Sequence, residues 1–479
     1  MSEPVVSHGT PRGDVPHVSV AIVGAGACGL TAALLLKDAG VDAVLLERDA
    51  EPSGSTALSS GFVPAPCTRV QRARGIDDSV QRFMQDIRDK THDTAAPHLV
   101  QAYARAIGPA IDALGERHGI AWELLDGFLY PGHSALRMHA VPERTGAGLM
   151  QRLQAAVQAA GVDLLTQALV RELWVEQGDS GVRITGLGYE RPDGAIEHLR
   201  CDALLLACNG FGGNAAMVRE LLPEMRDATF GGHVGNDGSA IAWGRALGVR
   251  LADLGGYQGH GSWAVPQGVL ISWALMMEGG VQINARGERF HDETGGYSEA
   301  SVAVLAQPGG TAWNLIDEGL MPLAQTFPDF REAQAAGACR RAETVAQLAQ
   351  IIGCDPQALE TTLNGIAQSA VSGQSDGFGR SFKRALQGPF TAIRVTGALF
   401  HTQGGLDIDA QCRVLNAQGQ PLPNLCAAGG AARGVSGNAV WGYLSGNGLL
   451  SAIAGGAIAA DTLSRQLQTA SLTAQESTP

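Results

Sequence analysis

The sequence predicts an α/β fold built around a parallel strand–helix–strand unit, and three features near the N-terminus carry that prediction. An apolar run over residues 18–23 leads into Gly24-x-Gly26-x-x-Gly29, a helical Leu/Ala segment follows, and a second apolar run ends at Glu47. Glycine-rich turns alone are weak evidence, because the chain has 64 glycines. A strand before the motif, a helix after it and an acid about 18 positions beyond it are together typical of a dinucleotide-binding unit.

Each position of this unit has a physical role. Gly24 allows the tight turn, Gly26 lets a pyrophosphate approach the backbone, and Gly29 lets helix and strand pack closely. The helix N-terminus offers free N–H groups and the positive end of its dipole to phosphates. Glu47 is expected to accept hydrogen bonds from ribose hydroxyls. The sequence therefore predicts a Rossmann-like nucleotide domain.

Length, charge and cysteine usage limit the possible functions. The 479 residues exceed one compact core and predict two domains. A net charge of −13 argues against nucleic acid and anionic membrane surfaces as partners. The eight cysteines include no CxxC or CxxCH, so no c-type haem, zinc knuckle or other metal site is expected, and they read as buried residues in a reducing compartment. No secretory signal is visible at the N-terminus, so the cytoplasm is the expected location.

The pattern of apolar and polar residues predicts an insertion within the nucleotide domain. The alternation of apolar and polar residues weakens beyond Ala252, and small apolar residues return at Ile393. The predicted divisions are a disordered lead (1–17), a first part of the nucleotide domain (18–251), a capping or substrate domain (252–392), a second part of the nucleotide domain (393–465) and a flexible tail (466–479). The apolar stretch 452–460 is too short to span about 30 Å of hydrocarbon and reads as a buried helix.

Further elements follow from periodicity and turn residues. We expect two helices within 77–118, a helix from Thr145 to near Gly161, paired strands at 163–175 and 182–189, a buried strand at 203–207, a helix from near Asp237 to Leu247, paired helices within 344–369 and a long helix through Leu463. The hydroxyl-rich loop 53–62 suits close approach to a phosphate and a flat ring system.

Seven motifs, spread over about residues 18 to 463, are specific in combination. They are GAGACGL with LLERDA, the loop 54–62, ACNGFGGN, Gly235-Asn-Asp-Gly, the NARGERF of 284–290, the HTxGG of 401–405, and AAGG followed by SGNGL. Together they resemble the fumarate reductase/succinate dehydrogenase-type flavoproteins, including the 3-ketosteroid Δ1-dehydrogenase-like branch. The resemblance implies a Rossmann-like (GR2-type) FAD-binding domain with an inserted α+β capping domain.

The resemblance also implies an FAD-dependent enzyme acting on CH–CH groups (EC 1.3-type) and a set of cofactor-binding residues. No histidine lies between Glu47 and Gly61, where succinate dehydrogenases attach flavin, so the FAD is expected to be bound non-covalently. The implied cofactor residues are Gly24, Gly26, Ala27, Cys28, Gly29, Glu47, Arg48, Gly54, Ser55, Thr56, Ser59, Ser60, Gly61, Phe62, Val170, Ala207, Cys208, Asn209, Gly210, Asn236, Asp237, Gly405, Gly429, Gly430, Asn447, Gly448, Leu449 and Leu450.

Departures from the family pattern bear on the substrate. Two arginines of the fumarate reductases, a proton donor and a carboxylate clamp, are absent from the segments beginning at Asp292 and Trp441, and each segment carries a tyrosine instead. That pattern is similar to the ketosteroid dehydrogenases, and it implies that Tyr297 takes an α-proton while Tyr443 and the N–H of Asn447 hold a carbonyl oxygen. His401, in HTxGG, points instead to a dicarboxylate.

Enolate chemistry requires these residue types. Removing an α-proton from a ketone creates negative charge on oxygen, so the site needs hydrogen-bond donors at the oxygen and a base at the carbon. A tyrosine has an ordinary pKa of about 10 and must be activated to act as the base. A purely structural role remains open for both tyrosines, and Arg289 reads as a salt-bridge partner. The candidate catalytic residues are Tyr297, Tyr443, His401 and Tyr130, and the candidate substrate-binding residues are Asn447, Gly446, Thr402 and His139.

The expected function is desaturation of a small ketone or keto acid, with a cyclic one favoured. The alternative is a fumarate reductase-like or tricarballylate dehydrogenase-like enzyme acting on a di- or tricarboxylate. A flavoprotein subunit that only relays electrons has little support, because no haem or iron–sulfur motif is encoded. The electron acceptor is unidentified, and a monomer or small homo-oligomer is expected.

Overall fold

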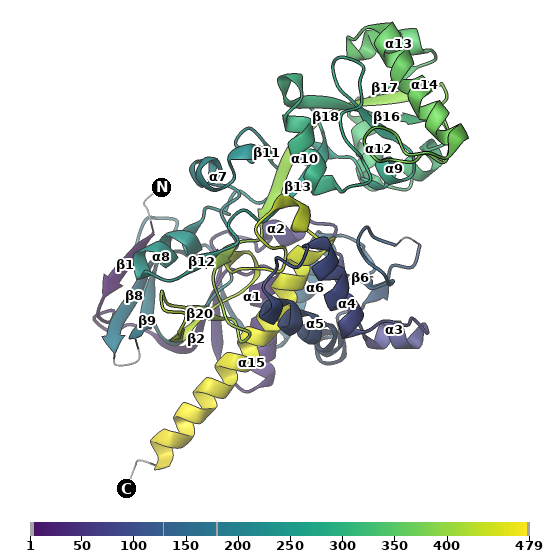
Figure 1. The fold of residues 1–479 in the computed structure, drawn as a ribbon. Helices are drawn as coiled ribbons and strands as arrows, with labels where there is room; N and C mark the ends of the chain where they lie inside the picture. The colour runs from purple at the N-terminus through teal and green to yellow at the C-terminus, as the bar shows by residue number, and fades with distance from the viewer. Residues whose placement is uncertain (1–3, 128, 179–180, 477–479) are drawn as a thin grey trace. The chain divides into compact units, whose positions relative to one another are not determined.

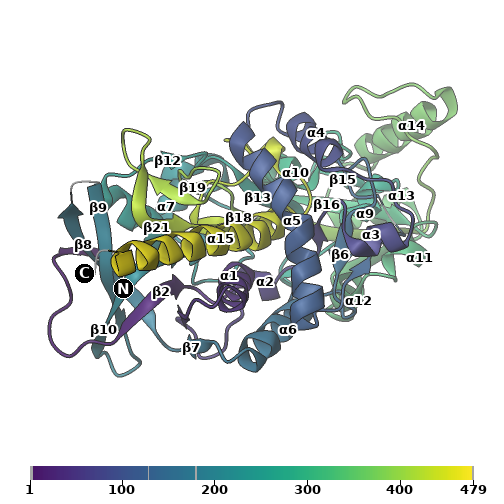
Figure 2. The same ribbon diagram turned by 90° about the horizontal axis from the view of Figure 1, so that it is seen from below.

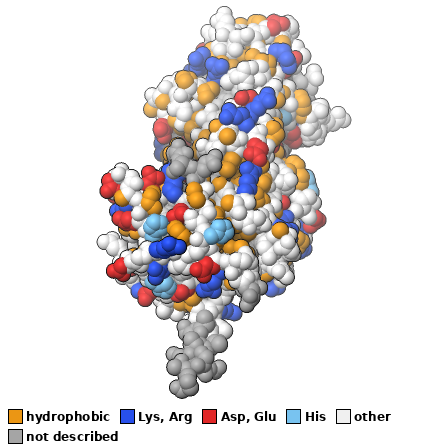
Figure 3. Space-filling model, turned by 90° about the vertical axis from the view of Figure 1, so that its left-hand side faces the viewer, with side chains coloured by type: hydrophobic (Ala, Val, Ile, Leu, Met, Phe, Trp, Pro, Cys, Tyr) orange, Lys and Arg blue, Asp and Glu red, His pale blue; other side chains and the backbone are white. Residues whose placement is uncertain are grey.

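The computed structural model describes residues 4–127, 129–178 and 181–476. The chain forms two compact units (Figure 1). The first unit contains the chain up to Leu221, then Gly232–Tyr257 and everything from His401 onward; the second contains Leu222–Gly231 and Gln258–Phe400. On the face drawn in Figure 3, acidic and basic side chains are interspersed.

The first unit is organised around a nine-stranded sheet with the order β1-β8-β9-β10-β2-β3-β7, and with β20 and β21 continuing from β10. Its strands are β1 (Val5–His8), β2 (His17–Val23), β3 (Ala43–Leu46), β7 (Asp163–Leu165), β8 (Leu169–Gly178), β9 (Gly181–Glu190), β10 (Ile196–Leu206), β20 (Arg413–Leu415) and β21 (Pro421–Ala427). The neighbours β21, β10, β2, β3 and β7 run parallel, so their carboxyl ends share one edge. The predicted α/β class and strand–helix–strand unit are confirmed.

Helices pack closely on this sheet. The long helix α15 (Asn447–Glu476) lies beside α1 (Ala27–Asp38) and α5 (Pro97–His118) (Figures 1 and 2). A Cβ at Gly456 of α15 would stand 2.5 Å from the Cys28 carbonyl oxygen of α1, so only glycine permits this crossing. In α1, Leu30 and Leu34 are fully buried, and each contributes roughly 1.5–3 kcal/mol through burial.

The remaining elements of the first unit are short. They are α2 (Gly54–Ala57), α3 (Arg69–Ala73), α4 (Val80–Lys90), α6 (Gly146–Ala159), α7 (Ala215–Leu221), α8 (Ser239–Leu247), β4 (Val63–Pro64), β5 (Glu123–Leu124), β6 (Met138–Ala140), β12 (Leu251–Ala252), β19 (Gly405–Leu406), and the 3-10 turns η3 (Gly429–Ala431) and η4 (Val440–Gly442). The helix predicted from Thr145 is α6, with the Thr145 hydroxyl accepting from the Gly148 N–H at 3.0 Å.

The second unit contains a seven-stranded sheet with the order β14-β13-β18-β16-β15, in which β11 and β17 also pair with β18. Its elements are η1 (Pro223–Met225), β11 (Thr229–Phe230), β13 (Tyr257–Ala264), β14 (Val269–Leu270), α9 (Ala274–Met277), β15 (Val281–Ile283), α10 (Tyr297–Leu305), η2 (Pro308–Gly310), β16 (Thr311–Asp317), α11 (Met321–Ala324), α12 (Pro328–Ala335), β17 (Cys339–Ala342), α13 (Val345–Ile352), α14 (Pro356–Ser372) and β18 (Phe390–Thr402). Two apolar clusters form its core, one containing Val304 and Phe330 and the other containing Leu315 and Leu348.

The boundaries of this unit differ from the predicted 252–392. Thr229 and Phe230 pair in parallel with Ala398 and Leu399, so the segment 222–231 belongs to the second sheet. The sheet strand β18 also runs past residue 392. Strand pairing between distant segments has no local sequence signal, so composition placed both boundaries a few residues away.

The ends of the chain are more ordered than expected. Residues 5–8, predicted as part of a disordered lead, form β1 and pair in parallel with 172–175 of β8, and the Gly9 N–H donates to the Val175 carbonyl at 2.8 Å. The predicted flexible tail is helical through Glu476, because no glycine or proline interrupts α15 after Gly456. Residues 477–479 lie outside the described part of the chain.

The described residues contain neither a membrane-spanning helix nor a cluster of metal-binding side chains. Within the described ranges, no helix combines the length and apolar character needed to cross a membrane. Among the same residues, no group of three or more His, Cys, Asp or Glu side chains is arranged to hold a metal ion.

Candidate active site

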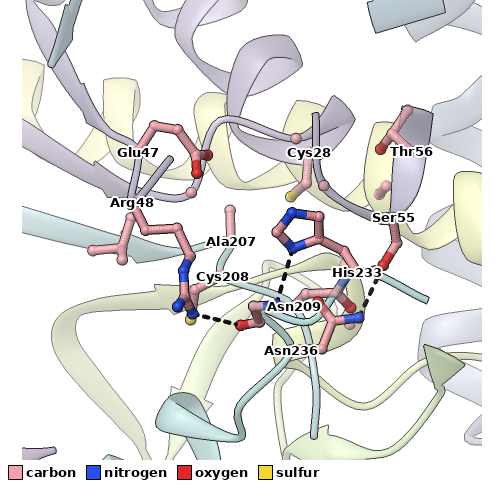
Figure 4. Close-up of a pocket in the computed structure, with 18 of the residues that line it drawn as sticks. Cys28, Glu47, Arg48, Ser55, Thr56, Ala207, Cys208, Asn209, His233 and Asn236 are labelled. Carbon is pink, nitrogen blue, oxygen red and sulfur yellow. Dashed lines mark hydrogen bonds between the residues drawn. The ribbon is translucent and has the colours of Figure 1, made fainter. Parts of the chain in front are cut away.

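A cavity of about 1110 Å³, including the part open to solvent, lies in the first unit. Its walls include residues that directly follow β2, β3 and β10, namely Gly24, Glu47 and Ala207, so it sits at the carboxyl edge of the parallel strands (Figure 4). Ligands of open α/β sheets bind at this edge.

The cavity wall nearest α1 suits a pyrophosphate. Gly24 has a φ of +104°, and a Cβ there would stand 2.6 Å from the Ala207 carbonyl oxygen, so this turn requires glycine. Gly26 faces open space, with only the Thr56 hydroxyl near its Cβ position, at 3.7 Å. The N-cap Gly26 of α1 has no side chain to cap the helix, and the Ala27 N–H donates to the Thr56 hydroxyl at 3.2 Å. Free N–H groups and an open backbone are what a bound diphosphate needs.

Glu47 lies in the wall at the end of β3. One carboxylate oxygen accepts from the Ala25 N–H at 2.9 Å and the other from the Asp49 N–H at 3.0 Å. These bonds fix the side chain, which is only 8 % exposed. Each carboxylate oxygen has a second lone pair, so Glu47 can still accept ribose hydroxyls as predicted.

Ser55 is oriented by two amides (Figure 4). Asn209 Nδ2 donates to Ser55 Oγ at 3.0 Å and Asn236 Nδ2 donates at 2.9 Å. Two donors occupy both lone pairs of this oxygen, so the hydroxyl proton is left to be donated elsewhere. Arg48 links the segment after β3 to residues 235–237, because it donates to the Gly235 carbonyl at 3.0 Å and to the Asp237 carboxylate at 3.2 Å.

Two cysteines line the cavity without being reactive. Burial raises the pKa of Cys28 to about 12, and burial together with the Asp237 charge raises the pKa of Cys208 to about 12. Both are neutral thiols at neutral pH. They serve as small packing residues, since the thiolate is the nucleophilic form.

The predicted cofactor residues divide into two groups. Those that line the cavity are Gly24, Gly26, Ala27, Cys28, Glu47, Arg48, Gly54, Ser55, Thr56, Val170, Ala207, Cys208, Asn209, Asn236, Asp237, Gly429, Gly430, Gly448 and Leu449. Those outside the lining are Gly29, Ser59, Ser60, Gly61, Phe62, Gly210, Gly405, Asn447 and Leu450. Several of the second group shape the fold instead: the Ser59 carbonyl accepts from the Gly146 N–H at 2.8 Å and so holds the start of α6.

Sequence reasoning missed some lining residues. They are Val23, Leu46, Asp49, Ala168, Leu169, His233, Gly235, Ser239, Trp243, Gln403 and Ala452. His233 Nδ1 accepts from the Gly235 N–H at 3.0 Å, and Nε2 lies 3.1 Å from an Asp49 carboxylate oxygen. Only the adjacent Gly235-Asn-Asp-Gly motif pointed to His233, and it gave no reason to choose that residue.

Of the two candidates His401 and Tyr443, only His401 is in the cavity lining. His401 lines the cavity, and its ring meets the Tyr443 ring edge to face, with centroids 5.4 Å apart and 70° between the planes. Burial lowers the pKa of His401 to about 4. Burial raises the pKa of Tyr443 well above its ordinary value, although hydrogen bonds from the Gly448 and Gly446 backbone act in the opposite direction. At neutral pH His401 is therefore a neutral imidazole with one ring N–H, and Tyr443 keeps its hydroxyl proton.

The backbone around Tyr443 differs from the prediction. The Asn447 N–H, expected to hold a carbonyl oxygen together with Tyr443, donates to the Leu444 carbonyl at 3.0 Å. The N–H groups that meet the Tyr443 hydroxyl belong to Gly446 and Gly448. The cause is a turn over 444–447, with a φ of +86° at Gly446, which uses the Asn447 N–H internally.

Three other candidates are absent from the cavity lining. His139 is fully buried, with Nε2 2.7 Å from the Thr68 hydroxyl and Nδ1 2.9 Å from the Arg137 carbonyl, so both nitrogens are used within the fold. The Thr402 hydroxyl accepts from the Phe211 N–H at 3.3 Å. Tyr130 packs edge-on against Phe62, and burial raises its pKa to about 12. None of the three is in the cavity lining, and their roles at the site stay predictions.

Tyr297 lies in the second unit as the first residue of α10. Its ring stacks on His260, with centroids 5.0 Å apart and 21° between the planes. His260 Nδ1 accepts from the Ser262 N–H at 3.1 Å, and burial lowers the pKa of His260 to about 3. Arg289 forms ion pairs with Glu293 and Asp376. The expected salt-bridge role of Arg289 is confirmed.

The comparisons with known proteins agree with this geometry. Residues 19–449 match the model of the FAD binding domain family. The NADH:fumarate oxidoreductase of Klebsiella pneumoniae is 28% identical over 423 residues, which are 87% of this chain and 45% of that protein, so the chain spans less than half of this relative. The open conformation of a flavocytochrome c3 fumarate reductase superposes with a TM-score of 0.80 at 26% identity, covering 94% of this chain and 78% of that one.

A third similarity concerns the fold alone. The 3-ketosteroid Δ1-dehydrogenase of Sterolibacterium denitrificans superposes with a TM-score of 0.77 at 20% identity, covering 94% of this chain and all of that one. The cavity and the family match define an FAD-dependent oxidoreductase that acts on CH–CH groups. The chain belongs to the FAD binding domain family, and its resemblance to fumarate reductase-type flavoproteins is confirmed.

Proposed function

We propose that the protein interconverts a CH–CH group and a C=C bond next to the carbonyl of a small ketone or keto acid. The observation that supports this proposal is His401 in the lining of the cofactor cavity, with its ring packed edge to face against Tyr443. Both groups are neutral and both carry a proton to donate. Among the described residues, the one arginine lining the cavity is Arg48, and it is occupied by Gly235 and Asp237.

The residues divide the chemistry as follows. When bound, FAD supplies the two-electron exchange with the substrate. Tyr443 and His401 donate hydrogen bonds to the carbonyl oxygen, where negative charge develops as the α-proton leaves. A preorganised donor of this kind is strongest where water is excluded, and Tyr443 is only 7 % exposed.

Tyr297 is the proposed base for the α-proton. It begins α10, and a helix N-terminus favours the negative charge of a phenolate. Its ring is held in place by the stacked His260. The same residues serve reduction of the C=C bond by returning the proton, so the names of the reductase relatives are compatible with the proposal.

A di- or tricarboxylate substrate is the second candidate. It is favoured by His401 in the HTxGG motif and by the 28% identity to a fumarate oxidoreductase. Against it stands the chemistry of the pair, because two neutral donors bind a carboxylate less strongly than an arginine fork does.

A bleaching experiment separates the two candidates. The holoenzyme is mixed anaerobically with cyclic ketones, keto acids, dicarboxylates and tricarboxylates, and the loss of oxidised-flavin absorbance is followed. Photoreduced enzyme is then tested for reoxidation by enones and by fumarate. We expect bleaching by a ketone or keto acid and reoxidation by an enone. Response to carboxylates only would replace the ketone proposal with the second candidate.

A further inference from the structure

Gln403 and His401 are joined by a hydrogen bond at the cavity. Gln403 Nε2 lies 3.1 Å from His401 Nδ1, and both residues line the cavity. The Gln403 backbone is held on both sides, because its N–H donates to the Gly256 carbonyl at 2.8 Å and its carbonyl accepts from the Gly434 N–H at 2.8 Å. With Gln403 only 3 % exposed, its amide has a defined position.

Two buried residues orient this amide. Ser436 Oγ donates to Gln403 Oε1 at 3.0 Å, and Asn447 Nδ2 donates to Ser436 Oγ at 3.2 Å. Ser436 is 1 % exposed and Asn447 is fully buried. We call Asn447, Ser436, Gln403 and His401 the Gln403 chain. Each donor in it points toward His401, so the Gln403 oxygen is taken by Ser436 and its nitrogen faces the imidazole.

His401 Nδ1 lies 3.1 Å from Gln403 Nε2, which is a donor, and 3.5 Å from the Thr402 carbonyl oxygen, which is an acceptor. The shorter of the two contacts favours an accepting Nδ1. An amide nitrogen is only a donor, so the ring nitrogen that it meets must be an acceptor. A neutral imidazole with an accepting Nδ1 carries its hydrogen on Nε2. We propose that Gln403, anchored by Ser436 and Asn447, is a positioning residue that holds neutral His401 as the Nε2–H tautomer.

The proposal gives His401 a defined task. Nε2 faces the start of α15, 2.8 Å from the Cβ position of Gly448, which also lines the cavity. His401 then offers an N–H to an oxygen atom and cannot accept a proton through Nε2. The identity of that oxygen as a substrate carbonyl rests on the proposed function, whereas the tautomer does not. Gln403 occupies the variable position of the HTxGG motif, to which the motif assigns no role.

Nitrogen NMR tests the tautomer directly. The FAD-bound enzyme is labelled with ¹⁵N-histidine, and the His401 signals, among 12 histidines, are assigned by their loss in His401→Asn. We expect a pyridine-type Nδ1 and a pyrrole-type Nε2 in the wild type. Gln403→Glu should reverse this pattern, because a carboxylate accepts an Nδ1–H.

Matched variants separate positioning from packing. Gln403→Met keeps the length of the side chain but removes the donor, and it should produce a mixture of both tautomers. Ser451→Ala changes another buried polar group of α15 that has no place in the Gln403 chain, and it should leave the His401 signals unchanged. Flavin absorbance and melting temperature establish that each variant is folded and loaded with FAD.

Kinetics supply a second readout. Residues that orient metal-bound histidines typically contribute about 10–100-fold, and by analogy Gln403→Met should lower turnover by a similar factor while FAD stays bound. A protonated Nδ1 in the wild type would mean that the amide is turned the other way, and the proposal would be wrong. An unchanged tautomer in Gln403→Met would also overturn it. Both measurements of the ring are made on resting enzyme, so they stand even if no ketone is a substrate.

Discussion

The Gly24 carbonyl oxygen occupies the space that a Cβ on residue 29 would need. Gly29→Ala should therefore displace α1 from β2 and destabilise the first unit, with or without FAD. Gly26→Ala meets only the Thr56 hydroxyl at 3.7 Å, so the apoprotein should keep its melting temperature while its affinity for FAD falls. Thermal denaturation of both apoproteins, followed by FAD titration, checks this. If both variants changed the melting temperature and the FAD affinity alike, Gly29 would not be specific to packing and Gly26 would not be specific to phosphate binding.

Glu47→Ala should weaken FAD retention, because the ribose hydroxyls lose their acceptor. The exposed Glu51 is close in sequence and absent from the cavity lining, so Glu51→Ala is the matched control and should retain FAD normally. The flavin-to-protein absorbance ratio after gel filtration measures retention. Undiminished flavin in Glu47→Ala would remove this carboxylate from the proposed ribose site.

Acid precipitation of the wild type should release the flavin into the supernatant, since no histidine lies between Glu47 and Gly61 to attach it. The supernatant absorbance gives the released fraction. A yellow pellet under a colourless supernatant would instead demonstrate a covalent link.

Tyr443→Phe should leave FAD bound and the fold intact while lowering turnover on a ketone. Loss of one preorganised oxyanion donor typically costs about 10²–10³ in rate, or about 3–4 kcal/mol of transition-state stabilisation. Phenylalanine keeps the ring that packs against His401. Steady-state kinetics with the substrate found by bleaching test this, and near-normal turnover would assign Tyr443 to packing alone.

Tyr297→Phe should act at a different step. If Tyr297 removes the α-proton, the variant should suppress exchange of the substrate α-hydrogen with deuterated solvent, measured by proton NMR. Tyr130→Phe is the matched control, because that tyrosine packs against Phe62 outside the cavity lining. Exchange at the wild-type rate in Tyr297→Phe would require another base.

Acid should destabilise the first unit before its carboxylates titrate. Burial lowers the pKa of His133, His139 and His401 to about 4, whereas a histidine in the unfolded chain has a pKa of about 6.5. The unfolded chain therefore binds more protons between these values, and stability falls as the pH drops from about 6.5 and levels off below about 4. Each histidine contributes on the order of 1 kcal/mol per pH unit.

Melting temperatures of the holoenzyme between pH 8 and pH 4.5 measure this slope. His139→Gln should flatten it, since one buried titrating group is removed, and the exposed His8→Gln should not. A slope that is the same in both variants would mean that buried histidines do not set the acid limit.

The local sequence pattern was sufficient to predict the main helices and strands of the first unit, but not the segments where it begins and ends. The strand–turn–helix around Gly24 and the helix after Thr145 follow from turn chemistry and apolar spacing, and both are present. Residues 5–8 carry no such signal, because their order comes from backbone pairing with β8. The segment 222–231 joins the second sheet for the same reason.

The sequence by itself determined the cofactor class and most of the cavity wall, since Gly24, Gly26 and Glu47 act through local backbone geometry and spacing. Only the tertiary structure decided the rest. It turned His139 into the fold by satisfying both ring nitrogens and moved the N–H donors at Tyr443 to Gly446 and Gly448. It also placed Gln403 against His401. The physical reason is that a side chain's role depends on which partner takes each donor and acceptor, and those partners are brought together by packing rather than by proximity along the chain.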